Sequence, residues 1–223
     1  MPVELIVSEL LDLNQTIGAD VFTNRFYLWD ILPELSDFIM TLGSSLPNDK
    51  YEILKDGVWA ARTAFIDSHC RIEPPTIIDE GAQIRFGAFI RGSVIVGKNS
   101  VVGNSTELKN CILFNKVQVP HFNYVGDSVL GFSSHLGAGA IISNVRSDKK
   151  SIVVTDGTKK IETNMKKFGA ILGDFVEVGC NAVINPGTII GRNSIIYPLS
   201  MVRGKIDKWK IHKNNGQIVP KIP

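Results

Sequence analysis

One histidine has sequence neighbours that suit proton transfer. His121 follows Pro120 in the run VPHFNYVGD, with Tyr124 three residues later and Asp127 at the end of the run. An imidazole titrates near neutral pH, so it is the usual group for removing a proton from an attacking amine or hydroxyl. A histidine in a loop can equally be a solvated surface group, and the neighbours of His121 alone do not decide between the two interpretations.

A pair of cations forms a second candidate for chemistry. Arg91 and Lys109 each directly follow an aliphatic residue, Ile90 and Leu108, and both aliphatic residues belong to a regular repeat along the chain. If the two cations are stacked, their charges repel unless an anion binds between them, and a phosphate suits the donors of Arg and Lys. The alternative is Glu73, which precedes Arg91 at the same spacing and would neutralise it at the surface.

That six-residue repeat sets the elements that would position these side chains. Every sixth residue from Ile66 to Phe114 is apolar, and the pattern resumes at Leu130 and again from Leu172 to Val202. A period of six does not fit an α-helix, but it fits three short strands per coil, with the aliphatic residue inside. The sequence therefore predicts an all-β solenoid, in which residues three repeats apart, such as Arg91 and Lys109, are stacked about 4.8 Å from each other.

Two segments leave the repeat, and solenoids place such insertions outside the coils as loops. We expect loops at 115–124 and 145–169. The second contains two β-rich runs around Asp156 and Gly157, a pattern typical of a protruding hairpin. The catalytic and binding residues of a solenoid are expected near such loops, because loops on a rigid scaffold carry most functional groups.

The ends of the chain lack the repeat and are expected to form separate parts. Apolar residues at helical spacing in ELIVSELLDL and FYLWDILPELSDFIMTL predict two amphipathic helices. We expect residues 1–58 to form a helical cap over the open end of the solenoid or an oligomer contact, 59–207 to form the repeat domain, and 208–223 to form a tail on the outside.

Composition narrows the classes of protein. The chain has 24 Lys plus Arg and 22 Asp plus Glu without a long charged block, so nucleic acid is not the expected partner. Acidic residues interrupt the apolar N-terminal pattern and no apolar stretch is long enough to span a membrane, which predicts a cytoplasmic protein. The three cysteines have no CxxC spacing, and His69, His121 and His135 lack an obvious carboxylate partner, so we predict no disulfide framework and no metal site.

Four motifs give the sequence a recognisable family character: GNSTELKN, VPHFNYVGDSVLG, LGAGAIISN and KKFGAILGDFVEVG, in this order. With them the chain resembles the hexapeptide-repeat acyltransferase superfamily. Within it, the chain looks like the acetyltransferase domain of the bacterial bifunctional UDP-N-acetylglucosamine pyrophosphorylase and glucosamine-1-phosphate N-acetyltransferase. The resemblance implies a left-handed parallel β-helix, a homotrimer with sites between neighbouring prisms, acetyl-CoA as acyl donor and glucosamine 1-phosphate as acceptor.

The resemblance also implies roles for residues on the acceptor side. His121 matches the catalytic base of the family, Arg91 and Lys109 match its basic pair on the sugar phosphate, and Tyr124 matches a tyrosine beside the substrate amine. A further phosphate-binding lysine is best matched by Lys167, which precedes Phe in KKFGAILGD. Two other lysines near the same insertion remain candidates for that role: Lys150 and Lys166.

On the donor side, the resemblance implies contacts with acetyl-CoA at Ala138, Asn144 and Cys180. Backbone amides around Gly137 to Gly139 are expected to polarise the acetyl carbonyl. The sequence departs from the family at two places. His135 replaces an asparagine near the substrate amine, and after Asn144 the chain reads Val-Arg-Ser where the family reads Tyr-Asp-Gly. The identity of the acceptor sugar is the property that these changes affect.

These residues lead to a preferred hypothesis and to two alternatives. The preferred hypothesis is an acetyl-CoA-dependent N-acetyltransferase of nucleotide-sugar biosynthesis that acts on an amino-sugar phosphate. The uridylyltransferase half of the family is not visible before the repeat, so a separate nucleotidyltransferase is the expected partner. The alternatives are a non-catalytic trimeric scaffold or sugar-nucleotide-binding regulator, and an O-acyltransferase for a different sugar, which the altered residue His135 keeps open.

Overall fold

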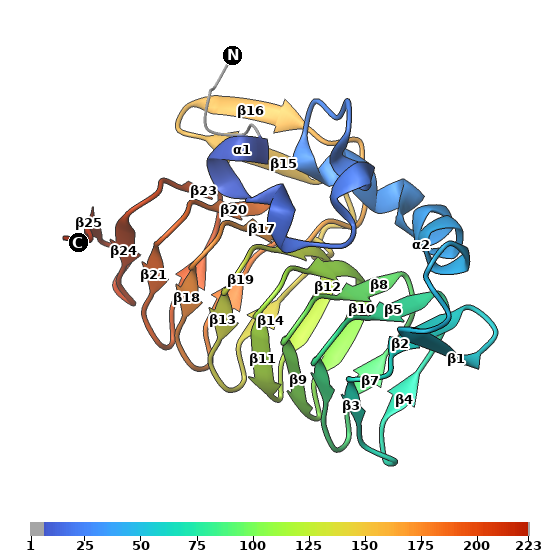
Figure 1. Ribbon diagram of the computed structural model, residues 1–223. Coiled ribbons are helices and arrows are strands. Elements are labelled where there is room, and N and C mark those ends of the chain that lie inside the picture. The colour runs from blue at the N-terminus through green and yellow to red at the C-terminus, as the bar shows by residue number, and fades with distance from the viewer. Residues whose placement is uncertain (1–6, 223) are drawn as a thin grey trace.

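The chain folds as a three-sided parallel β-solenoid. The computed structural model describes residues 7–222. Short strands stack from coil to coil along one axis, with the first coils at one end and the C-terminus at the other (Figure 1). The predicted solenoid with a small helical N-terminal segment is confirmed, because each strand pairs in parallel with its counterpart in the next coil.

Three faces form the prism. The first face consists of β2 (Val58–Ala61), β5 (Thr76–Ile78), β8 (Val94–Val96), the ends of β10 (Glu107–Leu113) and β12 (Tyr124–Leu130), β17 (Ala170–Leu172), β20 (Thr188–Ile190) and β23 (Lys205–Ile206). The second face consists of β3 (Phe65–Ile66), β6 (Gln83–Ile84), β9 (Val101–Asn104), β11 (Gln118–His121), β13 (His135–Leu136), β18 (Glu177–Val178), β21 (Ile195–Ile196) and β24 (Lys210–His212). The third face consists of β4 (Arg71–Ile72), β7 (Phe89–Ile90), the beginnings of β10 and β12, β14 (Ile141–Ile142), β19 (Val183–Ile184) and β22 (Met201–Val202).

The coil length changes in the middle of the solenoid. Residues that lie opposite each other in successive coils are three full repeats apart in the sequence as far as Leu108, which lies opposite Ile90. Beyond it the offset is shorter by a single residue, so that Leu113 lies opposite Val96. The coil loses this residue at the turn after the third face, where Asn110 adopts a positive φ of 48°. Leu113, not the following residue, therefore continues the row of inward aliphatic side chains.

The shorter coil overturns one prediction. Residues 115–124 were expected to form a loop, but β11 lies within this segment and belongs to the second face, with Gln118 opposite Val101 and His121 opposite Asn104. The apparent break arises because the repeat was counted at a constant period of six through Phe114, which lies one position after the true core residue. No residues are inserted here, and one is missing.

The second interruption is a true insertion. Between β14 and β17 the chain forms an antiparallel pair of β15 (Val153–Asp156) and β16 (Lys159–Glu162), so the predicted hairpin is confirmed. The stacking resumes directly after the insertion, where Leu172 lies opposite Leu130. The hairpin protrudes above the coils in Figure 1, beside the N-terminal segment.

The N-terminal segment differs from its predicted form. Part of the first expected helix lies outside the described residues, and the remainder is the short α1 (Val7–Leu10). Short 3₁₀ helices follow at Leu13–Gln15, Ala19–Phe22 and Leu28–Glu34. The last of these contains Pro33 and leads into α2 (Leu35–Ser44). Because proline lacks the N–H that a regular α-helix interior requires, the second expected helix is α-helical only beyond it.

The expected position of this segment over the open end is also wrong for the described residues. It runs along the first face (Figure 1). At the C-terminal coils, the Asp12 N–H donates a hydrogen bond to the Asp174 carboxylate. At the other end, α2 lies beside β5 and β8. The outward side chains of the first face are almost fully covered as a result: Ile77, Ile95, Ile112, Val129, Ile171 and Ile189. We call this segment, residues 7–44, the strap, because it runs along one side of the prism.

Strands cover both ends of the solenoid. β1 (Tyr51–Lys55) pairs antiparallel with β2 and extends the first face beyond the first coil. At the other end, β24 pairs in parallel with β21, and β25 (Ile218–Pro220) turns back along it. Residues from 208 onward are therefore joined to the second face, contrary to the tail expected on the outside. Among the described residues, no helix has the length and apolar character to cross a membrane.

Candidate functional site

His121 lies at the edge between the second and third faces. It ends β11, and its side chain is exposed. The backbone around it is fixed: His121 N–H donates to Asn123 Oδ1 at 3.1 Å, and Gly139 N–H donates to the His121 carbonyl at 3.0 Å. The buried Asn123 side chain also donates to the carbonyl of Gly137 at 2.8 Å in the next coil. The imidazole is therefore presented to solvent from a rigid turn.

Two residues predicted to contact acetyl-CoA share this edge with His121. Ala138 takes the position of His121 in the next coil, since Gln118 lies opposite His135 three residues earlier. Cys180 takes the same position in the following coil, and Asn181 N–H donates to the Ala138 carbonyl at 2.9 Å. The exposed thiol of Cys180 and the small Ala138 leave an open strip beside the imidazole. We call this row of residues 121, 138 and 180 the histidine edge.

The predicted cations lie at the other edge of the third face. The Arg91 guanidinium donates to Glu107 Oε1 at 2.7 Å, and this hydrogen bond raises the pKa of Arg91 above its ordinary value. The alternative in which Glu73 neutralises Arg91 is wrong, because Glu73 pairs with Lys55 at 3.3 Å and Arg71 at 2.6 Å. The counter-ion of Arg91 comes from the adjacent strand and lies on the third face itself.

Lys109 lies next to Arg91 in this row, and a third cation joins them. Burial lowers the pKa of Lys109 most, Asp127 opposes that effect, and contact with Lys167 lowers the pKa further. Among the candidate lysines, Lys167 is thus the one whose ammonium group lies beside Lys109. Lys150 lies in the exposed turn at Asp148, to whose Oδ1 its N–H donates at 3.2 Å. We call Arg91, Lys109 and Lys167 the cation cluster.

A buried carboxylate supports the cation cluster. Asp127 is 4% exposed and accepts hydrogen bonds from the side-chain amides of Asn144 and of Asn110, the latter at 2.8 Å. Burial raises the pKa of Tyr124, and the charge of Asp127 raises it further. A Cβ on Gly126 would lie 2.6 Å from the Tyr124 hydroxyl, so only glycine leaves room for the tyrosine beside the cations. Sequence reasoning did not assign a role to Asp127 or Asn110.

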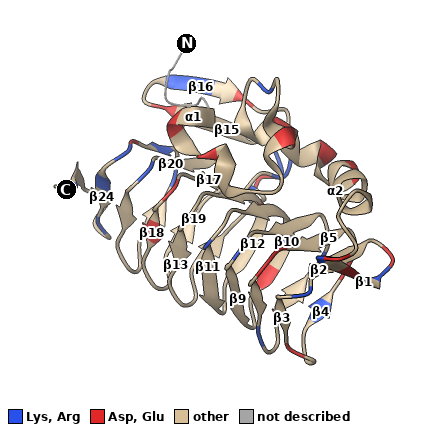
Figure 2. Cartoon of the chain, in the orientation of Figure 1, with Lys and Arg blue, Asp and Glu red and all other residues tan. Residues whose placement is uncertain are grey.

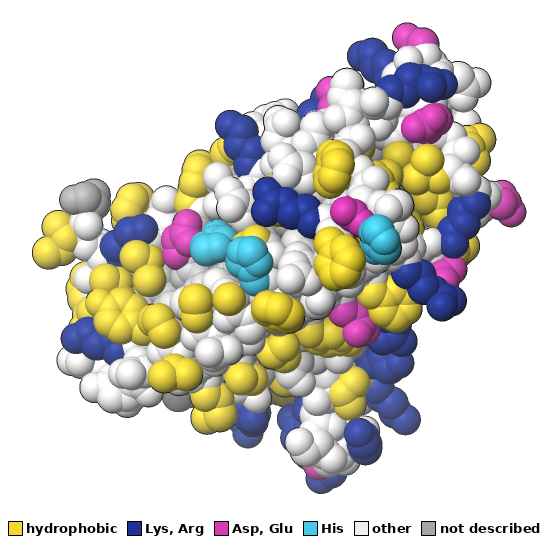
Figure 3. All heavy atoms as spheres, turned by 90° about the horizontal axis from the view of Figure 1, so that it is seen from below, with side chains coloured by type: hydrophobic (Ala, Val, Ile, Leu, Met, Phe, Trp, Pro, Cys, Tyr) yellow, Lys and Arg dark blue, Asp and Glu magenta, His cyan; other side chains and the backbone are white. Residues whose placement is uncertain are grey.

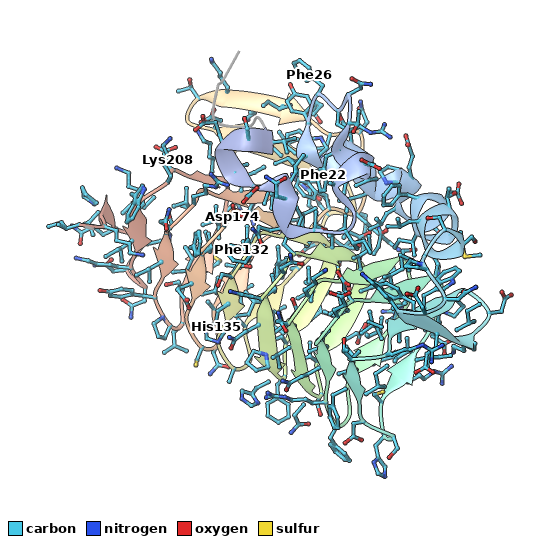
Figure 4. All side chains as sticks on the ribbon, viewed as in Figure 1. Phe22, Phe26, Phe132, His135, Asp174 and Lys208 are labelled. Carbon is cyan, nitrogen blue, oxygen red and sulfur yellow. The ribbon has the colours of Figure 1, made fainter. Side chains whose placement is uncertain are left out.

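The structure separates two residues from the groups to which the resemblance assigned them. Asn144, expected with acetyl-CoA, lies beside Asp127 at the cation cluster and not at the histidine edge. His135, expected near the acceptor amine beside Tyr124, projects from the second face on β13 (Figure 4). Its Nδ1 lies 2.9 Å from Glu177 Oε2 in the next coil.

The third face therefore separates a histidine from a group of cations within one chain. The outward residues between the two edges are Glu107, Tyr124 and Ile141, one from each of three successive coils. Viewed from below, this side of the molecule carries histidine and basic side chains among many hydrophobic ones (Figure 3). Such a face can bind an anion at one edge and accept a proton at the other. Among the residues described, no group of three His, Cys, Asp or Glu is arranged to hold a metal ion.

Several known proteins are similar to this chain in sequence. The chain is 32% identical over 237 residues to the bifunctional protein GlmU of Methanococcus maripaludis, covering 96% of this chain and 54% of that protein. It is 32% identical over 175 residues to the bifunctional sugar-1-phosphate nucleotidylyltransferase/acetyltransferase of Sulfurisphaera tokodaii, covering 70% of this chain and 43% of that protein. The chain thus spans about half the length of these relatives, and the predicted resemblance to the bifunctional enzymes is confirmed.

A solved structure and a family model also resemble this chain. The acetyltransferase domain of PglB from Neisseria gonorrhoeae aligns with 86% of this chain and 66% of that chain, at 13% identity. Its TM-score of 0.38 is too low to support an inference about function. The model described as the GMPPB C-terminal domain matches residues 72–197, which is more than half of the chain. The protein therefore belongs to the GMPPB C-terminal domain family.

Proposed function

We propose that the protein is an acetyl-CoA-dependent N-acetyltransferase that acts on an amino-sugar phosphate, with glucosamine 1-phosphate as the first candidate. The observation that carries this proposal is the cation cluster, in which Lys109 lies beside Lys167 and Arg91 and the three cations outnumber the two nearby carboxylates, Glu107 and Asp127. A phosphate would relieve this repulsion. The printed names of the relatives, which combine sugar-1-phosphate nucleotidylyltransferase and acetyltransferase activities, support the same substrate class.

In the proposed reaction, the amine of the bound sugar attacks the carbonyl carbon of the acetyl thioester. His121 takes the proton that the amine loses as the new C–N bond forms, and the C–S bond then breaks to release the thiol of the coenzyme, which receives a proton. No covalent intermediate is required, so Cys180 acts as part of the binding strip and not as a nucleophile. Tyr124 lies on the third face beside the cation cluster, where it can position the sugar.

Backbone amides near Ala138 are suited to stabilise the oxyanion of this reaction. Two of the expected donors are engaged within the solenoid: Gly137 N–H donates to Val178 at 2.7 Å, and Gly139 N–H donates to His121 at 3.0 Å. Ala138 itself projects at the histidine edge between His121 and Cys180. The Ala138 amide is therefore the donor that we assign to the acetyl carbonyl.

We further propose a homotrimer in which the histidine edge of one copy faces the cation cluster of a neighbouring copy. Within one chain, His121 and the cations lie at opposite edges of the third face. Packing prisms side by side would bring the two edges together, as the family resemblance implies. The acetylated product would then pass to a separate nucleotidyltransferase in the cytoplasm, completing the pair of activities in the relatives' names.

The direct test is to mix the purified protein with acetyl-CoA and glucosamine 1-phosphate and to follow thiol release. His121→Ala should reduce turnover by about 10²–10⁴-fold without changing the melting temperature. His69→Ala is the matched control, because His69 is exposed on another part of the solenoid and should leave turnover unchanged. Binding of acetyl-CoA without turnover would redirect the search to hydroxyl acceptors, and binding of neither ligand would favour a non-catalytic scaffold.

A mixing experiment tests the shared site. His121→Ala and Lys109→Gln are each expected to be inactive on their own. Subunits of the two variants, unfolded and refolded together, should regain part of the activity, because some interfaces then pair an intact histidine edge with an intact cation cluster. Activity that stays at the level of the separate variants would place the complete site within one chain.

A further inference from the structure

The β15–β16 hairpin forms one wall of a cavity at the surface of the solenoid. The cavity has a volume of about 560 Å³ and lies between the β15–β16 hairpin, the segment 143–148 and the turns at Asn185 and Arg203. We call it the hairpin cleft. Its size falls in the range typical of small-molecule sites. These four segments of the sequence form its walls, so it is not a groove within one loop.

The hairpin is held firmly against the solenoid. Val154 of β15 is fully buried, and Lys205 Nζ lies 3.2 Å from Asp156 Oδ1 at the hairpin turn. A Cβ on Gly187 would lie 2.7 Å from the Ile152 side chain, which shows how closely the base of the hairpin approaches the coil. With Val154 on the packed side, alternate residues on the other side of the hairpin face the cleft: Val153, Thr155, Lys160 and Glu162.

Two cations of the hairpin cleft form no ion pair with the residues that the structure describes. Arg146 is occupied by a forked pair of hydrogen bonds to Asp148, at 2.9 and 2.6 Å. Lys160 and Arg203, by contrast, form no salt bridge with any other residue in the described range 7–222. They come from different walls of the cleft, and Figure 2 shows that β16 carries basic residues. Two such cations suit an anion with more than one phosphate group.

The remaining lining suits a ribose and a ring. Ser143, Ser147 and Thr155 line the cleft, and their hydroxyl groups are of a kind that bonds to sugar oxygens. Apolar surface comes from Val145, Val153 and Pro186, against which a flat base could pack. This mixture of cations, hydroxyl groups and a small apolar surface matches the chemistry of a nucleoside diphosphate.

The cleft adjoins the proposed acetyl-transfer site. Ser143 and Val145 line it, and the residue between them, Asn144, bonds to Asp127 beneath the cation cluster. We propose that the hairpin cleft binds the nucleoside diphosphate portion of a ligand whose other end reaches the third face. Two ligands carry this group: the acyl-donor coenzyme and a nucleotide-linked sugar acceptor. The link to the third face rests on the proposed function, whereas nucleoside diphosphate binding does not.

The proposal is tested by calorimetric titration of the full chain with ADP and with UDP at low ionic strength. At least one should bind, and Lys160→Gln and Arg203→Gln should each weaken binding about tenfold or more, since each removes a charged hydrogen bond. Lys159→Gln is the matched control, because Lys159 is the adjacent exposed lysine and does not line the cleft. Glu162→Gln should leave binding equal or tighter, because it removes a negative charge from the wall.

Competition distinguishes the two sources of the nucleotide. Displacement of acetyl-CoA by ADP assigns the cleft to the coenzyme, whereas simultaneous binding of acetyl-CoA and UDP assigns it to the acceptor. Failure of both nucleotides to bind at millimolar concentration, or equal affinity in wild type and in the Lys160 and Arg203 variants, overturns the proposal. Because binding is measured without turnover, loss of the cleft proposal leaves the acetyl-transfer proposal standing, and the reverse also holds.

Discussion

The ammonium groups of Lys109 and Lys167 lie beside each other although the two lysines are far apart in the sequence, on either side of the hairpin insertion. Burial is the largest cause of the lowered pKa of Lys109, and the contact with Lys167 adds to it. A nearby like charge disfavours the charged form of Lys109, and a bound anion would offset this effect. We therefore propose that the pair binds an anion, with Lys167 supplied from directly after the hairpin insertion.

Replacing one of these lysines separates binding from stability. Lys167→Gln should weaken the binding of glucosamine 1-phosphate about tenfold, because a charged hydrogen bond is lost. Its unfolding free energy should stay equal or rise slightly, because removing the like charge raises the pKa of Lys109 toward its ordinary value. Ligand titration and urea unfolding measure the two effects. Lys166→Gln is the control, and equal weakening in both variants would contradict the assignment of Lys167.

Asp79 gives the protein a pH-dependent stability. Its side chain is fully buried, accepts from the Tyr51 hydroxyl and the Glu80 N–H, and leaves Oδ2 without a partner. Burial raises its pKa above the ordinary value of 3.8 despite these bonds. The folded state therefore holds the proton more tightly than the unfolded chain. This contribution to stability is complete below the ordinary pKa and is lost as the pH rises through the raised one.

Asp79→Asn removes this dependence, because an amide does not ionise. The unfolding free energy of the variant minus that of the wild type should increase as the pH rises from the ordinary carboxyl pKa of 3.8 toward neutrality. Urea unfolding at several pH values measures the difference. Asp174, whose pKa burial also raises, is present in both proteins and cancels. A difference that does not change with pH would show that Asp79 keeps its ordinary pKa.

The strap along the first face should contribute strongly to stability. Phe22 is 3% exposed and packs edge-on against Phe114 of the solenoid, with ring centroids 5.9 Å apart. Phe22→Ala should cost about 3–5 kcal/mol, since it leaves a cavity in a closed contact. Phe26→Ala, in the same segment but 63% exposed, should change stability by less than about 0.5 kcal/mol. Figure 4 labels both side chains.

Tryptophan fluorescence provides the measurement for this pair. Trp29 lies in the same segment, is 1% exposed, and packs against Phe168 with centroids 5.5 Å apart. Its emission should shift when the strap leaves the solenoid during urea unfolding. If Phe22→Ala and Phe26→Ala unfold at the same urea concentration, the strap does not hold the first face in the way the packing indicates.

Much of the solenoid was predictable, because inward side chains of stacked strands must be aliphatic and therefore recur at a fixed spacing. The shortening of the coil by one residue near Asn110 was not predictable from the repeat. Phe114 is apolar, so the period of six continued through it by coincidence. The sequence does contain a pattern that indicates the strap. On the first face, the residue before the inward aliphatic residue is also aliphatic, as in Ile77 and Ile95. A strand that is apolar on both sides needs a cover.

The site was predictable where it follows the repeat. The row of His121, Ala138 and Cys180 results from equal positions in successive coils, once each offset is known. The position of Asn144 could not be predicted from the repeat. Asn144 was grouped with Ala138 and Cys180, but its hydrogen-bond partner Asp127 lies at the opposite edge of the third face. The buried roles of Asp127 and Asn123 depend on turn geometry, and single polar residues in turns carry no periodic signal.

The strap also changes how the solenoid comes apart. Coils of a repeat protein contact only their neighbours, so terminal coils can fray one at a time. Here Lys208 Nζ lies 3.0 Å from Glu9 Oε2, and Arg192 Nε donates to the Leu10 carbonyl at 3.1 Å, while α2 of the same strap packs on β5 and β8. Opposite ends of the array are thus joined through one segment. We expect such long-range closure to slow folding. Because the strap couples the two ends, we also expect the coils to unfold together in a single transition.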